Sequence, residues 1–96
     1  GEITWLPVTR PMYWEVALNR IKLGEINLND PARAIIDTGT SLIAMTTFLA
    51  EFINIRLGAV PTSAGVWALD CAKLPSLPPI EFELNGNTFT LTPEEY

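Results

Sequence analysis

Apolar and polar residues alternate along several short stretches of this chain, a repeat typical of β-strands that bury one face. Pro7 falls late in the first stretch and favours an edge strand there, because proline has no backbone N–H to donate. The predicted strands are Ile3 to Val8, Tyr13 to Leu18, Ile21 to Leu23, Ile26 to Leu28, Ala34 to Ile36, Val66 to Leu69, Ile80 to Leu84 and Thr88 to Leu91. Short strands separated by dense turns predict a mainly β protein, an antiparallel barrel or sandwich.

Residues that form turns separate these strands. Gly24 follows the third strand, and Asn29-Asp30-Pro31 precedes the fifth. Asn85-Gly86 lies between the last two strands and is a strong signal for a tight hairpin.

One helix is predicted from Phe48 to Leu57, where apolar residues recur at spacings of three and four. Thr46 or Thr47 can cap its start, and Gly58 suits its end. The apolar stripe of this helix is expected to pack against the strands.

The three tryptophans are expected in the core rather than as platforms for a ligand. Trp5, Trp14 and Trp67 each lie in an apolar strand pattern, and large aromatic side chains contribute much of the buried area of a small domain.

Composition limits the size of the fold and the class of partner. A chain of 96 residues is one domain or less, and a hydrophobic content of 48% supports a packed core. A net charge of −5 and a pI near 4.4 argue against nucleic acid or an anionic membrane as partner, since both attract basic patches. No apolar stretch reaches the roughly 18 residues of a membrane-spanning helix.

The residue types present also limit the chemistry. The chain has no histidine, which excludes a Ser-His-Asp, Cys-His or histidine-based metal site within it. No calcium-loop spacing occurs, so we expect neither a metal nor a cofactor. The single Cys71 is a buried thiol, the partner of another chain, or half of a bridge whose other half lies elsewhere.

One carboxylate stands in a context suited to catalysis. Asp37 follows the apolar residues Ala34 to Ile36, which we expect to form a short buried strand, and Gly39 comes two residues later between Thr38 and Thr40. Burial raises the pKa of a carboxyl group, whereas hydrogen bonds from the Gly39 N–H or the Thr40 hydroxyl lower it. On these residues alone, an ordinary polar turn after a strand is the simpler interpretation.

A single carboxylate cannot divide the work of acid and base. Two carboxylates within a few ångströms share one proton, so that one acts as base on a water while the other acts as acid. If Asp37 is catalytic, a second aspartate must come from a copy of this chain or from another segment.

The sequence around Asp37 belongs to a longer series of recognisable segments. The segments, in order, are Trp5-Leu6-Pro7-Val8, Tyr13-Trp14, Asp37-Thr38-Gly39-Thr40-Ser41-Leu42-Ile43, Leu69-Asp70-Cys71, Leu77-Pro78, Ile80-Glu81-Phe82, Asn85-Gly86 and Thr92-Pro93-Glu94-Glu95-Tyr96. Their order and spacing resemble the C-terminal lobe of the pepsin-like aspartic proteases, nearest to the proteinase A and cathepsin D branch. The resemblance covers essentially all 96 residues.

The resemblance implies a role for each residue of the motif. Asp37 would be the catalytic aspartate of the C-terminal lobe. Thr38 would hold its hydroxyl in the contact that locks the two active-site loops together. Gly39 would donate its N–H to the Asp37 carboxylate, and Thr40 would donate its hydroxyl to the outer oxygen.

Three residues outside the motif also receive roles from the resemblance. Tyr13 would lie near the substrate pockets on the leaving-group side, and Ile35 beside the cleft. Cys71 would form a disulfide with a cysteine outside this chain.

The resemblance further implies what the chain lacks. The family's first Asp-Thr-Gly motif, the flap tyrosine and the later part of the lobe are absent, so residues 1–96 would be a partial C-terminal lobe, inactive by itself. Its partners would be an N-terminal lobe with the second aspartate, the remainder of the C-terminal lobe, peptide substrates and pepstatin-type inhibitors. The whole protein would be an acid endopeptidase in the vacuole or lysosome, or secreted.

Two other functions stay open at this point. The lobe could bind peptides or an inhibitor without catalysis if its partner lobe lacks an aspartate. A homodimer of the retroviral type, in which each copy gives one aspartate, fits less well because of the lone Cys71 and the proline-rich stretch from Leu74 to Pro79.

Overall fold

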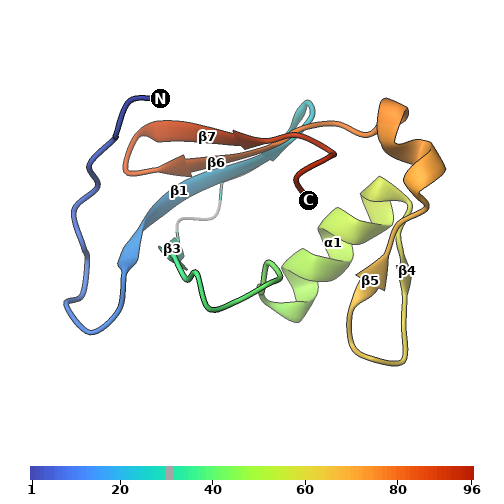
Figure 1. The fold of residues 1–96 in the computed structure, drawn as a ribbon, viewed down its shortest axis with the longest axis horizontal. Helices are drawn as coiled ribbons and strands as arrows, with labels where there is room; N and C mark the ends of the chain where they lie inside the picture. Colours follow the sequence, from blue (N-terminus) through green and yellow to red (C-terminus); the bar gives the residue numbers. More distant parts are fainter. Residues whose placement is uncertain (30–31) are drawn as a thin grey trace.

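The structure is a computed structural model that describes residues 1–29 and 32–96, so Asp30 and Pro31 of the predicted turn lie outside the described residues. The predicted class, mainly β with antiparallel pairing and one clear helix, is confirmed (Figure 1), and a 3₁₀ helix is present as well. The elements are β1 (Glu15–Leu23), β2 (Ile26–Leu28), β3 (Ala32–Ile35), α1 (Thr47–Leu57), β4 (Val60–Pro61), β5 (Trp67–Ala68), the 3₁₀ helix η1 (Cys71–Ser76), β6 (Ile80–Leu84) and β7 (Asn87–Leu91).

Strand β1 is the centre of the main sheet. Its first half pairs with β3, with Glu15 opposite Ile35, and its second half pairs with β2. Strand β6 pairs with residues Leu18 to Leu23 of β1, and β7 pairs with β6. All four pairings are antiparallel.

The sequence pattern predicted two strands in place of the continuous β1, with an interruption at Asn19. The structure corrects this prediction: the pairing with β6 shifts register between Leu18 and Arg20 and then continues. Such a bulge absorbs one extra residue without ending the strand. The Asn19 side chain accepts a hydrogen bond from the Gly86 backbone N–H at 2.9 Å, which ties the bulge to the β6–β7 turn.

The predicted hairpin at Asn85-Gly86 is confirmed. Both residues have positive φ, 47° and 81°, the combination that a two-residue turn of type I′ requires. The preference of Asn and Gly for this conformation explains why the sequence signal was reliable here.

Helix α1 has the predicted ends. The Thr46 side chain accepts a hydrogen bond from the Leu49 N–H at 3.4 Å, and Gly58 closes the helix in the left-handed conformation with φ 75°. Two of its apolar side chains, Ile53 and Leu57, face the sheet and are buried.

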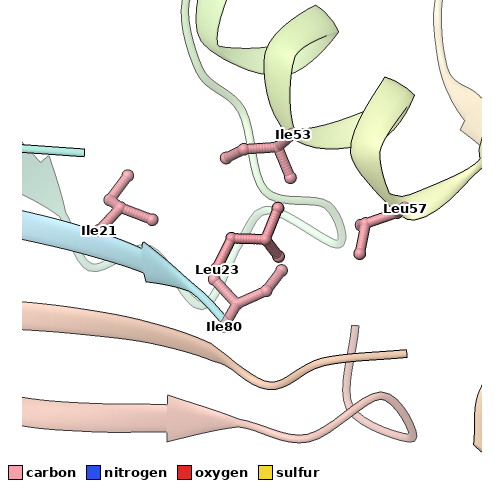
Figure 2. Packing of buried hydrophobic residues seen from close by; sticks show 5 residues of the cluster. All are labelled: Ile21, Leu23, Ile53, Leu57 and Ile80. Atoms are coloured by element: carbon pink, nitrogen blue, oxygen red, sulfur yellow. The ribbon is translucent and has the colours of Figure 1, made fainter. Parts of the chain in front are cut away.

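The core lies between the main sheet and α1. Figure 2 shows its five buried residues gathered around one point: Ile21 and Leu23 of β1, Ile80 of β6, and Ile53 and Leu57 of α1. These residues come from three elements that are far apart in the sequence. The core therefore forms only when β1, α1 and β6 come together.

Several predictions of burial were wrong. Residues 3–8 form no strand, and the side chains of Trp5 and Trp14 are 85% and 76% exposed, while Trp67 is half-buried. Phe48, the first residue of the predicted apolar stripe, is also exposed. Within residues 1–29 and 32–96, no element covers these side chains, so an apolar pattern did not lead to burial.

Candidate active site

Asp37 directly follows the edge of the main sheet. Strand β3 ends at Ile35, and the Ile36 N–H donates to the carbonyl oxygen of Trp14 at 2.9 Å, which extends the contact with the residues before β1. The chain then turns away at Asp37 and Gly39. The position of Asp37 is thus set by the pairing between β3 and β1.

The predicted burial of this segment is wrong for the described residues. Ile35 and Ile36 are 53% and 51% exposed, and Asp37 is exposed as well. Strand β3 is paired with β1, and although Thr9 and Arg10 pack around Glu15 opposite Ile35, the Ile35 side chain itself stays half exposed in the described part of the chain. An apolar run of three residues fixes a strand but does not determine what covers it.

Both oxygens of the Asp37 carboxylate accept hydrogen bonds from its own turn. The Gly39 backbone N–H donates to Oδ1 at 2.9 Å, and the Thr40 hydroxyl donates to Oδ2 at 2.5 Å. The Thr40 hydroxyl, followed by the Gly39 N–H, holds the pKa of Asp37 below its ordinary value, because both donors favour the charged form. The two hydrogen bonds that the resemblance implied are therefore present.

Gly39 also provides the space for this arrangement. A Cβ atom at this position would lie 3.2 Å from Asp37 Oδ1, closer than side chains usually approach. Thr38, which lies between Asp37 and Gly39, is exposed. Its contact with a second lobe stays a prediction.

An open apolar pocket of about 570 Å³ borders Asp37. It contains both residues that were predicted to contact substrate: Tyr13 from the turn before β1, and Ile35 from β3. The remaining residues that line it are Val8, Pro11, Met12, Trp14, Ile36 and Asp37. A carboxylate at the edge of an apolar hollow is an arrangement that can hold an apolar side chain next to a reacting bond.

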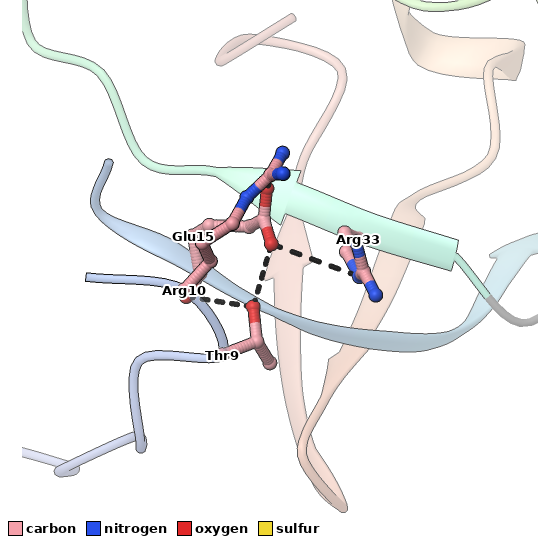
Figure 3. Close-up of polar contacts among 4 residues, drawn as sticks. All are labelled: Thr9, Arg10, Glu15 and Arg33. Carbon is pink, nitrogen blue, oxygen red and sulfur yellow. Dashed lines mark hydrogen bonds and ion pairs between the residues drawn. The ribbon is translucent and has the colours of Figure 1, made fainter. Parts of the chain in front are cut away.

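The sequence analysis missed one charged residue near this pocket. Glu15 is buried at the start of β1, and its carboxylate meets Thr9, Arg10 and Arg33 (Figure 3). The available signal was a carboxylate inside a run of strand-forming residues, between Trp14 and Val16. A charge in that position needs partners, because an unpaired buried charge is strongly unfavourable.

Cys71 begins η1 and its thiol is free and exposed, which removes the buried thiol from the three possibilities. Among the residues that the structure describes, no three His, Cys, Asp or Glu side chains are placed to hold a metal ion. No helix in the described ranges has the length and apolar character needed to cross a membrane.

Comparison with known proteins gives matches along the whole chain. A sequence model of the family described as "Eukaryotic aspartyl protease" matches residues 1–96. The vacuolar aspartic protease of Candida albicans is 47% identical over 98 residues, and cathepsin D of Clupea harengus is 38% identical over 98 residues. These matches cover 100% of this chain but only 23% and 25% of the two relatives, so the chain spans about a quarter of their length.

A solved structure agrees with these matches. The aspartic proteinase from Irpex lacteus superimposes with a TM-score of 0.81 at 28% sequence identity, over 97% of this chain and 29% of that protein. The fold and the sequence therefore lead to one conclusion: this chain belongs to the eukaryotic aspartyl protease family.

Proposed function

We propose that this chain is part of an acid endopeptidase and supplies Asp37 as one of two catalytic carboxylates. The observation that supports this most directly is the Asp37 turn, in which Gly39 and Thr40 donate to the two carboxylate oxygens within four residues. Membership of the aspartyl protease family makes hydrolysis of peptide bonds the expected reaction. The second carboxylate would come from an N-terminal lobe, and residues 1–96 would be part of the C-terminal lobe.

The reaction would follow from a shared proton. Two neighbouring carboxylates titrate as a pair, and the donors to Asp37 lower the first apparent pKa of that pair by stabilising one negative charge. The charged member would take a proton from a water molecule as that water attacks the peptide carbonyl, while the protonated member would donate to the carbonyl oxygen. No covalent intermediate with the protein is needed.

The pocket beside Asp37 suggests the class of substrate. Its lining is mostly apolar, and Tyr13, from the turn before β1, and Ile35, from β3, are both part of it. We therefore propose that these two residues contact a bulky apolar side chain next to the bond that is cleaved.

The test is the substitution Asp37→Asn in the full-length protein, assayed at acidic pH with a peptide substrate and with pepstatin. Cleavage should fall below about a thousandth of the wild-type rate, because the pair loses one of its two acids. Asp70→Asn is the matched control, since the Asp70 carboxylate accepts from the Ala72 N–H at the start of η1 and the asparagine side-chain oxygen can do the same. Cleavage that survives Asp37→Asn would remove Asp37 from the mechanism.

The alternative of a binding lobe without catalysis gives a different result in the same assay. The full-length wild-type protein would then bind pepstatin or a peptide but cleave nothing. The Asp37→Asn variant would also cleave nothing. The open apolar pocket beside Asp37 would serve such a function equally well.

The names of the relatives suggest a location. The relative from Candida albicans is called vacuolar, and we propose a vacuolar, lysosomal or secreted location for the protein that contains this chain. In an oxidising secretory compartment, the exposed Cys71 thiol would form a disulfide with a cysteine outside this chain.

A further inference from the structure

The least exposed charged side chain of the described residues belongs to Glu15, whose side chain is 6% exposed. Thr9 donates its hydroxyl to Glu15 Oε1 at 2.8 Å. Arg10 Nη2 lies 3.8 Å from Oε2, and Arg33 Nε lies 3.7 Å from Oε1. The Glu15 carboxylate thus contacts groups from two segments that are separate in the sequence, as Figure 3 shows.

On one side, Glu15 closes the turn that carries Tyr13. The Thr9 backbone N–H donates to the Glu15 carbonyl oxygen at 2.9 Å, and Arg10 and Glu15 form an antiparallel bridge. Inside the turn, the N–H groups of Met12 and Tyr13 approach the Arg10 carbonyl oxygen at 2.8 and 3.4 Å. Backbone and side chain of Glu15 together hold the base of the turn.

On the other side, Glu15 contacts the strand that leads to Asp37. Arg33 belongs to β3, and Ile35 is paired directly with Glu15. Asp37 follows two residues after Ile35. One carboxylate therefore joins the two walls of the pocket, the turn and the end of β3.

Packing of apolar side chains contributes little to holding the walls together in the described residues. Met12, Tyr13 and Trp14 are exposed, and so are Ile35 and Ile36. Their side chains therefore do not fix the distance between the turn and β3 through packing. That distance depends on the pairing of β1 with β3, on the hydrogen bond from the Ile36 N–H to the Trp14 carbonyl oxygen, and on the contacts of Glu15.

We propose that Glu15 is a positioning residue that sets the width of the pocket beside Asp37, and so determines how strongly the protease prefers a bulky apolar side chain there. This inference rests on the proposed function. Glu15 touches neither the substrate nor the reacting atoms. It acts through Thr9 and Arg10 on the turn and through Arg33 on β3.

The test uses the full-length protein with Glu15→Gln, which keeps the shape and the Thr9 hydrogen bond but removes the charge, and with Thr9→Val, which removes only the hydroxyl. Peptides carry leucine or alanine in turn at each position next to the scissile bond. In Glu15→Gln we expect the ratio of kcat/KM for leucine over kcat/KM for alanine to fall about tenfold at one peptide position. The fall should come from a change in KM, and kcat should stay within about threefold of wild type. For Thr9→Val we expect a fall of about threefold at the same position.

Glu83→Gln is the matched control, since Glu83 makes a cross-strand ion pair with Arg20 at 2.9 Å on the same sheet, whereas Glu15 contacts Arg10 of the turn and Arg33 of β3. It should leave every ratio unchanged. A loss of kcat/KM that is equal for all peptides, or an unchanged ratio in Glu15→Gln and Thr9→Val, would show that Glu15 only stabilises the fold and would overturn the inference.

Failure of the proposed function would be recognised separately, because the wild-type protein would then cleave no peptide. In that case, amide hydrogen exchange measures how readily the turn opens. Glu15→Gln should raise the exchange rate of residues 9–14 at least about tenfold above that in Glu83→Gln, since opening of the turn would become easier. Equal rates in the two variants would contradict the inference without any use of activity.

Discussion

At the scale of single residues, the Asp37 turn is a local device. Both donors to its carboxylate lie within three residues, so the turn needs little support from the rest of the molecule. This locality explains why the two hydrogen bonds could be predicted from the sequence. The contact of Glu15 with Arg33 could not, because it depends on which residues of β3 lie opposite β1.

The Thr40 hydroxyl should have a measurable effect on the pH dependence of activity. It is the main cause of the lowered pKa of Asp37, so Thr40→Val should raise that pKa towards its ordinary value. If the charged Asp37 is needed, activity is lost as the pH falls through this pKa, and a raised pKa moves the acid limb of the kcat/KM profile to higher pH. Thr90→Val, in the exposed part of β7, is the control. An acid limb that stays in place or moves to lower pH would contradict the prediction.

At the scale of elements, the signals that the sequence analysis used differ in what they depend on. The ends of α1 and the Asn85-Gly86 hairpin were predicted correctly, because capping and positive φ are properties of a few neighbouring residues. The stretch from Ile3 to Val8 was predicted wrongly as a strand. A strand also needs a partner, and none pairs with it in the described ranges.

Helix α1 allows a direct test of which apolar residues stabilise the fold. Ile53→Ala should lower the free energy of unfolding by about 2–4 kcal/mol, because Ile53 lies in the core between α1 and the sheet. Phe48→Ala is the control within the same helix, since Phe48 is exposed in this chain. If Phe48 is also exposed in the full-length protein, its substitution should change the value by less than about 0.5 kcal/mol. Denaturant unfolding of the two full-length variants measures both free energies of unfolding. Equal decreases in Ile53→Ala and Phe48→Ala would contradict the core described above.

The end of α1 gives a second test at this scale. Gly58 has φ 75°, and Gly58→Ala should cost about 1 kcal/mol, because a Cβ atom disfavours the left-handed conformation. Gly58→Asn should cost less, since asparagine tolerates this conformation better than alanine. The midpoint of denaturant unfolding ranks the stability of the wild type, Gly58→Asn and Gly58→Ala. A Gly58→Ala variant more stable than Gly58→Asn would exclude this explanation.

At the scale of the whole molecule, more large apolar side chains are exposed than buried in the described residues. The core contains few residues, whereas a larger group of big apolar side chains is exposed. That group includes Ile3, Trp5, Met12, Tyr13, Trp14, Ile35, Ile36, Leu42, Ile43, Phe48, Ile55 and Val60. A surface of this kind usually marks contact with further protein. This is the part of the structure that the sequence could not predict, because the pattern shows that a residue is apolar but not where its cover comes from.

The 96-residue chain should therefore behave differently from the full-length protein. By itself it should bind the dye ANS and associate at micromolar concentration, because its apolar surface is open to water. It should also show no cleavage of peptides, since it has one Asp-Thr-Gly motif. Dye fluorescence and sedimentation measure the first expectation. A monomer without dye binding would mean that these side chains find cover within the chain in solution.

The central position of β1 has a consequence during protein synthesis. Strand β1 ends at Leu23, but its partner β6 begins only at Ile80, whereas β2 and β3 follow at once. At a synthesis rate of about 5–20 residues per second, one edge of β1 waits several seconds for its partner on the ribosome. Stalled nascent chains that end before Ile80 should be cut by a protease within β1, and chains in which β6 has left the exit tunnel should resist. If both are cut equally, β6 does not protect β1. The same open edge would make this sheet dependent on the order and speed of its own translation.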